Sequence, residues 1–208
     1  MDSIKAPFLP RKKIIDIANK LSCQHSLEIP VRVEFILENI GFNIIPLPGL
    51  QYELSKFGSQ EAFLSISDSG QVEINIDDEI SSNIYLNFRG NFTLAHEYGH
   101  YVLHQDIFKK IKDINQFAKL YADKHFSETW DEIERQANFF ASYFLMPSHW
   151  FSVFMNEIFA KNDIEIDSFG PEDKRNLGKY IKSDISKKFE VSESAAHIRV
   201  NNFFNYHC

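Results

Sequence analysis

The chain has 208 residues, a net charge of −7 and a hydrophobic content of 44%, including 20 Phe. This composition suffices for a core, and no stretch approaches the ~20 consecutive apolar residues of a membrane-spanning helix or the apolar run of a secretion signal. Cys23 and Cys208 are far apart and without metal-ligand spacing, which excludes a disulfide framework. We therefore expect a cytoplasmic protein with no membrane contact.

Two helices and a strand are expected near the N-terminus. The spacing of apolar residues predicts an amphipathic helix over 11–21 and a second helix over 31–40, closed by Gly41. Residues 42–47 are typical of a strand, which prolines end.

A hairpin and a third strand should follow. Residues 61–66 and 72–76 alternate apolar and polar side chains on either side of a Ser-Asp-Ser-Gly sequence at 67–70. Residues 84–88 predict another strand and residues 89–91 a short turn. The predicted fold class is α+β, with a small mixed or antiparallel sheet packed on helices.

The next expected helix, over residues 92–104, carries the sequence His-Glu-Tyr-Gly-His at 96–100. Histidines four residues apart lie on one helical face, so His96 and His100 can reach the same metal ion. Glu97 would point toward that ion without binding it and would act as the catalytic base for the attacking water. So short a pattern also arises by chance, but the helix is apolar, whereas two surface histidines would need no such surroundings.

Gly99 is unusual inside this helix, because glycine costs an exposed helix about 1 kcal/mol relative to alanine. We interpret it as a place where a second backbone approaches the metal-binding helix.

A third metal ligand is expected from a helix that begins at Ser127 or Thr129, with Thr129 in a capping box, and ends before Pro147. The residues on one face of this helix are Glu134, Ala137, Asn138 and Ala141. Small residues around a carboxylate would let the two helices pack closely, with Glu134 on the metal and Asn138 supporting a ligand. The alternative is that Glu134 is a solvated residue near an acidic helix start.

Residues 105–126 connect these two helices and have apolar residues at helical spacing, which favours a helix packed on the core over a lid beside the cleft. His104 and His125 are either structural or stabilise an oxyanion during catalysis.

Residues 92–100, together with Glu-x-x-Ala-Asn-x-Phe-Ala-x-x-x-Leu-Met-Pro at 134–147, resemble the ImmA/IrrE metallopeptidases. Residues 30–42 fit the same family. One position departs from the family pattern, because Asn91 stands where relatives often have Arg, and Arg89 lies two residues earlier. The resemblance implies a minimal zincin-like domain, with a strand edge beside the metal helix where an extended substrate adds as a further strand.

The tail has a different charge from the rest of the chain. Residues 171–208 hold seven Lys/Arg and five Asp/Glu, a net charge of +2, against −9 for the remainder. Two helices are expected there, with Ser192 as the N-cap of the second, and their sequence resembles helix-turn-helix modules that the family often carries. We favour packing or substrate recognition over DNA binding, because Glu190 and Glu193 lie at the would-be recognition helix.

We divide the chain into a metallopeptidase domain (1–150), a linker (151–170) and a helical, helix-turn-helix-like appendage (171–208). The predicted site consists of one Zn²⁺, or another divalent metal, held by His96, His100 and Glu134, with Glu97 as the base and Asn138 supporting a metal ligand.

The resemblance also implies a substrate, because relatives cleave, or promote cleavage of, Cro/CI-type helix-turn-helix repressors and so relieve repression of stress or mobile-element genes. A repressor encoded nearby is the expected partner. The alternatives are a non-catalytic anti-repressor or antitoxin-binding protein with a structural metal, and a toxin-like protease encoded beside an antitoxin. An intact Glu97 favours catalysis, since a structural site has no use for a base.

Overall fold

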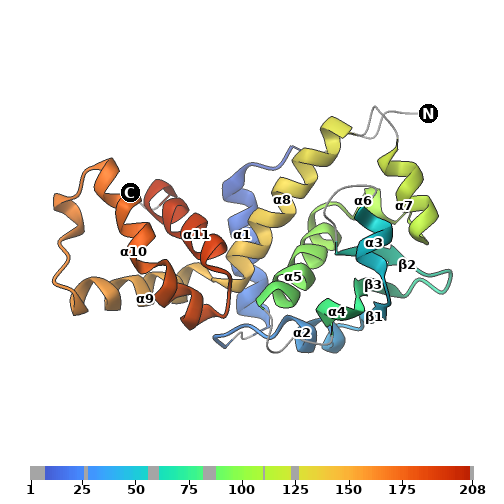
Figure 1. The fold of residues 1–208 in the computed structure, drawn as a ribbon, viewed down its shortest axis with the longest axis horizontal. Helices are drawn as coiled ribbons and strands as arrows, with labels where there is room; N and C mark the ends of the chain where they lie inside the picture. The colour runs from blue at the N-terminus through green and yellow to red at the C-terminus, as the bar shows by residue number, and fades with distance from the viewer. Residues whose placement is uncertain are drawn as a thin grey trace. The chain divides into compact units, whose positions relative to one another are not determined.

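The computed structural model describes residues 8–25, 28–55, 61–81, 88–109, 111–122 and 127–206. These residues belong to two compact units (Figure 1). The first unit comprises Met1–Ile17 and Arg32–Ala141, and the second comprises Ala18–Val31 and Ser142–Cys208. Among the described residues, no helix combines the length and apolar character needed to cross a membrane.

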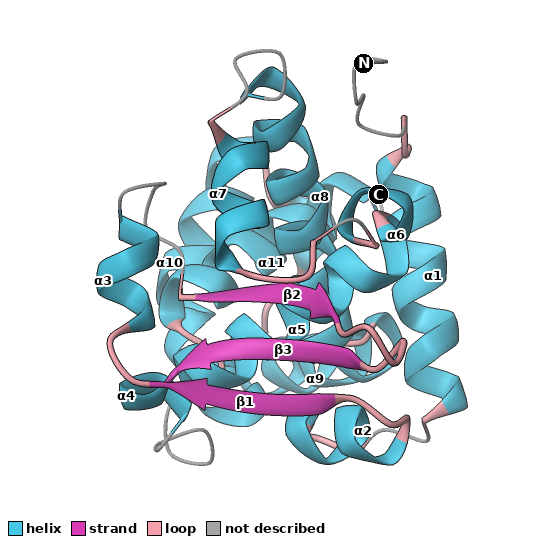
Figure 2. Cartoon of the chain, turned by 90° about the vertical axis from the view of Figure 1, so that its right-hand side faces the viewer, coloured by secondary structure: helices cyan, strands magenta, loops and turns pink. Residues whose placement is uncertain are grey.

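The first unit contains a three-stranded sheet with strand order β1-β3-β2 (Figure 2). The strands are β1 (Asn43–Leu47), β2 (Ala62–Ile66) and β3 (Val72–Asp77). β1 runs parallel to β3, whereas β2 and β3 form the predicted antiparallel hairpin, with Gly70 in its turn at φ +82°. Pro46 lies inside β1 rather than after it, which an edge strand tolerates.

Helices surround this sheet and build the core of the first unit. They are α1 (Arg11–Gln24, divided between the units), α2 (Val33–Asn39), α3 (Leu50–Leu54), α4 (Asp78–Ser81), α5 (Phe88–Leu103), α6 (Gln105–Phe108), α7 (Ile114–Tyr121) and α8 (Ser127–Leu145, also divided). α5 packs against β2 behind the sheet in Figure 2, where Leu64 and Leu94 are fully buried. Gly41 follows α2 at φ +89°, as expected of the glycine that closes a helix.

The start of α5 differs from the prediction. Residues 89–91, expected to form a turn, lie in the first turn of the helix together with Phe88. Asn91 is buried there, and its side-chain oxygen accepts a hydrogen bond of 3.1 Å from the Val33 backbone N–H at the start of α2. This tertiary contact overrides the local turn preference of Arg-Gly-Asn. The rest of the predicted strand 84–88 lies outside the described residues.

The connection between α5 and α8 is also not the single helix that was predicted. It contains α6 and α7, separated by a segment in which the Ile111 carbonyl accepts a hydrogen bond of 3.0 Å from the Ile66 N–H of β2. Asp113 then caps α7, with its side chain accepting from the Gln116 N–H at 2.9 Å. Ile107, Phe108 and Phe117 are buried, so the predicted packing on the core is confirmed.

α8 begins at Ser127, one of the two predicted starts, and ends at Leu145, before Pro147. Thr129 lies inside the helix, so the capping box predicted at that residue is wrong.

The second unit is mostly helical in the part of it that the structure describes. It contains α9 (Ser148–Lys161), the 3-10 helix η2 (Ile166–Ser168), α10 (Pro171–Phe189) and α11 (Glu193–Tyr206). α10 packs along α11, and Ser192 accepts a hydrogen bond of 3.1 Å from the Ala195 N–H, as predicted for an N-cap. Residues 151–170, the predicted linker, include most of α9 and all of η2; the domain division itself stays a prediction.

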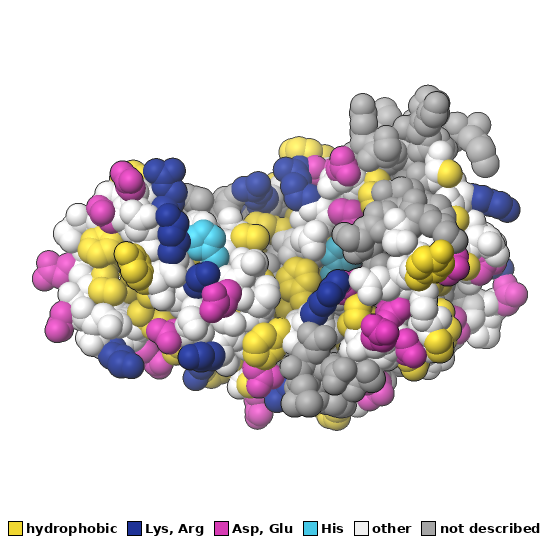
Figure 3. All heavy atoms as spheres, in the orientation of Figure 1, with side chains coloured by type: hydrophobic (Ala, Val, Ile, Leu, Met, Phe, Trp, Pro, Cys, Tyr) yellow, Lys and Arg dark blue, Asp and Glu magenta, His cyan; other side chains and the backbone are white. Residues whose placement is uncertain are grey.

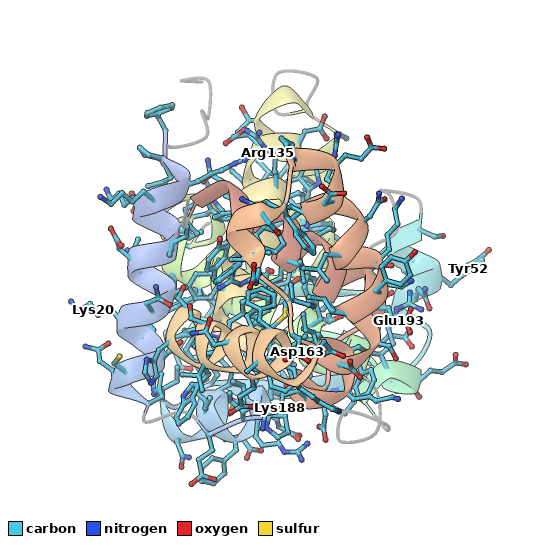
Figure 4. All side chains as sticks on the ribbon, turned by 90° about the vertical axis from the view of Figure 1, so that its left-hand side faces the viewer. Lys20, Tyr52, Arg135, Asp163, Lys188 and Glu193 are labelled. Atoms are coloured by element: carbon cyan, nitrogen blue, oxygen red, sulfur yellow. The ribbon has the colours of Figure 1, made fainter. Side chains whose placement is uncertain are left out.

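Charged side chains of both signs lie on the surface of the second unit. Lys182 on α10 forms an ion pair of 2.8 Å with Glu193 on α11. Lys188 and Glu193 are among the side chains labelled in Figure 4, and Figure 3 shows basic and acidic groups interspersed over α9–α11.

Candidate metal centre

Three acceptor groups converge where α5 meets α8. His96 and His100 lie one turn apart on α5, and Glu134 projects from α8. The His96 and His100 Nε2 atoms are 2.9 Å apart, and the Glu134 oxygens lie 3.0 Å from His100 Nε2 and 3.3 Å from His96 Nε2. One atom from each residue fits within 4.8 Å of the others, so the structure brings together the three ligands that the sequence predicts.

Gly99 allows the close approach of the two helices. A Cβ atom placed on Gly99 would lie 3.0 Å from the Phe140 ring and 3.3 Å from both the Cα and the carbonyl oxygen of Ala137. Any side chain at residue 99 would therefore push α8 away from the histidines, and the close backbone contact expected from the sequence is confirmed.

The ring nitrogens that face away from the cluster have partners of their own. His96 Nδ1 lies 3.1 Å from Asn138 Oδ1, and His100 Nδ1 lies 3.1 Å from His104 Nδ1. Asn138 is thus placed to support a ligand, as expected. With both Nδ1 atoms engaged, both Nε2 atoms face the point that the Glu134 carboxylate also faces, where a proton or a metal ion can lie between them.

This donor set fits a divalent cation. Two imidazole nitrogens and one carboxylate are a ligand set that catalytic zinc sites use. Three acceptors placed so close together, partly out of water, repel one another unless a proton or a metal ion lies between them.

The pKa shifts in the cluster reflect this need for positive charge. Burial lowers the pKa of His96, but the Glu134 carboxylate, with help from Glu97 and Asn138, outweighs it and raises the pKa to about 9. His100 has a lowered pKa, because of its burial and of the charge on His96. Burial raises the pKa of Glu134, but hydrogen bonds to both histidines hold it well below its usual range. Without a metal, His96 therefore carries a proton at neutral pH that a metal would have to displace.

Glu97 lies beside the cluster and is 5% exposed. Burial raises the pKa of its carboxyl group to about 7; the charge on His96 and a hydrogen bond from the Leu64 backbone N–H of β2 oppose that rise. α5 thus supplies the two histidine ligands and a carboxylate with a raised pKa, and a backbone group of β2 holds that carboxylate in place.

Arg89 supports the site from outside. Its guanidinium forms an ion pair with Glu61, which precedes β2, and Thr93 Oγ1 lies 3.1 Å from the same carboxylate. Glu61 therefore ties the start of β2 to α5. Arg89 thus contacts the carboxylate of Glu61, whereas Asn91 bonds to the start of α2.

Two residues of α8 that the sequence reading did not assign to the site extend it further. Gln136 Oε1 lies 3.0 Å from His104 Nε2, and Gln136 Nε2 lies 2.7 Å from Glu132 Oε1. Glu132 and Gln136 are four residues apart, as are His100 and His104, and that shared spacing was the available signal. His104 is 2% exposed with both nitrogens engaged, so it does not face an oxyanion; His125 lies outside the described residues.

Comparison with known proteins agrees with this geometry. The model of a peptidase family, Peptidase_M78, described as the IrrE N-terminal-like domain, matches residues 87–201, more than half of the chain. That span includes α5 and α8 with all three candidate ligands. A search of curated proteins found no match.

Proposed function

The chain belongs to the IrrE N-terminal-like domain family of peptidases, and on that premise we propose that it is a zinc-dependent endopeptidase that cleaves a helix-turn-helix repressor. The observation that carries the proposal is the convergence of His96, His100 and Glu134 on one point, with Glu97 buried beside them. A site that only stabilises the fold would need the three ligands but would not need Glu97.

His96 and His100 would hold the metal through Nε2 and Glu134 through its carboxylate. A zinc ion bound there supplies a Lewis acid that polarises the scissile carbonyl and acidifies a water molecule. Asn138 and His104 hold the two imidazole rings in the orientation that this binding requires.

Glu97 would move the protons of the reaction. Its carboxylate accepts one from the attacking water and then passes it to the nitrogen of the leaving amine. Burial raises the pKa of Glu97 to about 7, which suits a group that must both accept and return a proton near neutral pH.

The outer edge of β2 near Ala62 and Leu64 is the surface that we propose for an extended substrate, because the Ile66 N–H farther along this edge already donates to the Ile111 carbonyl. Asp77 donates to the Glu61 carbonyl, and Ser67 donates to the Gln71 carbonyl, so alternate residues of β2 pair with β3. Ala62 and Leu64 fall between these pairs and turn their backbone groups away from β3, toward the side where Leu64 meets Glu97. A peptide added along this edge would run beside the catalytic base.

The repressor is proposed from the resemblance to relatives that act on Cro/CI-type proteins, and such a substrate places the reaction in the cytoplasm. The test incubates zinc-loaded protein with the helix-turn-helix protein encoded beside its gene, together with Glu97→Gln. Mass spectrometry should find one cleaved bond with the unaltered protein. We expect Glu97→Gln to bind zinc and to cleave about 10²- to 10⁴-fold more slowly.

The control is Glu157→Gln, an exposed substitution on α9, which should cleave at the normal rate. A stable complex without cleavage, formed equally by the unaltered protein and Glu97→Gln, would contradict the peptidase and establish an anti-repressor.

A further inference from the structure

The outer edge of β2, the strand farthest from β1 in Figure 2, is closed at one end. Ala62, Leu64 and Ile66 turn their backbone groups toward this edge, because the residues between them pair with β3. The Ile66 N–H donates to the Ile111 carbonyl at 3.0 Å, so this end is already paired. The Ala62 N–H and carbonyl have no hydrogen-bond partner among the residues that the structure describes. The edge therefore offers pairing positions on the Ala62 side only.

The segment that closes the edge is itself held in place. Ile111 is 1% exposed, and its N–H donates to the Phe108 carbonyl at 3.0 Å. The next residue, Lys112, donates its N–H to Gln116 Oε1 at 3.0 Å, and its side chain forms an ion pair with Asp68, beyond the end of β2. An extended peptide would displace this segment only by breaking several of these contacts at once, so a substrate strand ends before it.

The proposed catalytic base meets the edge between its two ends. The Leu64 N–H donates to the Glu97 carboxylate, so a peptide bond that this base serves lies near Leu64. Ala62 lies two residues to one side of that point, and the paired Ile66 lies two residues to the other. A substrate can therefore form backbone hydrogen bonds with β2 on one side of the scissile bond, but it meets a strand end on the other side.

We propose that the cleft recognises an extended segment on only one side of the scissile bond, and that the substrate turns away from the sheet directly on the other side. This inference rests on the proposed function and adds the substrate class, which is a polypeptide whose extended segment ends at a bend. Antiparallel pairing, the commoner arrangement of neighbouring strands, places the extended segment on the C-terminal side of the scissile bond.

The first experiment measures amide hydrogen exchange by NMR, in the protein alone and with the helix-turn-helix protein encoded beside its gene. Alone, we expect slow exchange at Ile66 and fast exchange at Ala62. The partner should slow the exchange at Ala62 and leave that at Ile66 unchanged. Fast exchange at Ile66 in the protein alone, or an unprotected Ala62 in the complex, would overturn the proposal.

This measurement separates the inference from the proposed function, because it requires no proteolysis. A partner that is bound but not cleaved refutes the peptidase, while the exchange rates in that complex still test the one-sided edge. If no complex forms, the proposed repressor is wrong, and the exchange rate of Ile66 in the protein alone still tests the closed end.

The second experiment compares peptides that span the scissile bond and are shortened one residue at a time from either end. Shortening on the extended side should lower kcat/KM by about tenfold for each pairing position lost. Shortening on the other side should change kcat/KM by less than about twofold, because no backbone hydrogen bond is lost there. Equal losses on the two sides would overturn the proposal.

A proline at residue 62 tests the open end in the protein itself. The Ala62 N–H faces away from β3, so Ala62→Pro costs the sheet no hydrogen bond. We expect KM to rise about tenfold, with kcat and zinc affinity nearly unchanged. The matched control is Ile44→Pro on the opposite edge strand, β1, where Pro46 shows that proline is accepted; KM should stay unchanged. An unchanged KM for Ala62→Pro would overturn the proposal, and if that variant does not fold, the shortened peptides decide.

Discussion

The buried titratable groups at the metal centre of the first unit contact one another, whereas the buried guanidinium of the second unit contacts aromatic rings and a carbonyl. Arg199 is 0% exposed, and its guanidinium carbon lies 3.9 Å from the Tyr143 ring centre and 4.2 Å from that of Phe151. Its Nε donates to the Met146 carbonyl near the end of α8 at 3.3 Å. In the first unit, by contrast, His96, His100 and Glu134 present acceptors to one another.

The difference shows how a binding site is told from a buried structural charge. The positive charge of Arg199 is compensated by rings and a helix end that the fold itself supplies. The acceptors of the first unit are compensated only by a cation added to them. Burial of charge occurs in both units, so it is the convergence of lone pairs that marks the metal centre.

The largest effect on stability is expected at Arg199. Arg199→Ala removes two cation–π contacts and the packing of a large buried side chain, and should lower the free energy of unfolding by about 3 kcal/mol. Arg199→Met keeps most of the volume and should cost about 1 kcal/mol. Urea unfolding of the metal-free protein measures both changes, and chelator competition should show unchanged zinc affinity. Equal losses for the two variants would contradict this account of the guanidinium.

The next effect compares one glycine from each unit. Gly99→Ala places a methyl group against the backbone of Ala137, so we expect a loss of about 2 kcal/mol together with weaker zinc binding. Gly178→Ala on α10 meets only side chains, the nearest at 3.3 Å, and the higher helix propensity of alanine should offset the contact to within about 1 kcal/mol. Thermal unfolding and zinc affinity of the two variants test the comparison; similar behaviour at both positions would refute it.

A further effect concerns pH. The raised pKa of His96, about 9, lies above its unfolded value of 6.5, so His96 stabilises the metal-free protein fully below pH 6.5 and loses that contribution as the pH rises through 9. Zinc must displace the same proton. Apparent zinc affinity should therefore rise about tenfold, or about 1.4 kcal/mol, per pH unit between pH 7 and 9. Calorimetry in buffers of different ionisation enthalpy should find one proton released per zinc at pH 7; no proton release would contradict the shift at His96.

The sequence predicted those parts of the site that depend on spacing along one helix. His96, Glu97 and His100 share a face by helical periodicity, Glu134 and Asn138 do so on α8, and the hairpin follows from alternation around Gly70. Gly99 predicted the close contact between the two helices, because a glycine lowers the stability of a helix that has no such contact.

The features that the sequence did not predict depend on partners distant in the chain. Asn91 lies in α5, where its side chain accepts a hydrogen bond from the start of α2. α6 and α7 are separate helices because the Ile111 carbonyl between them pairs with the edge of β2. The link from His104 to Gln136 likewise joins two helices, and the four-residue spacing within each helix does not say which helix faces which.

The most direct test of the account is a zinc titration of the unaltered protein beside Glu134→Gln, with Arg199→Met as the variant from the other unit. We expect one zinc per chain for the unaltered protein and Arg199→Met, with equal affinity, and a loss of at least about 100-fold for Glu134→Gln. Zinc binding of equal strength in Glu134→Gln, or none in the unaltered protein, would contradict the claim that His96, His100 and Glu134 form a metal centre.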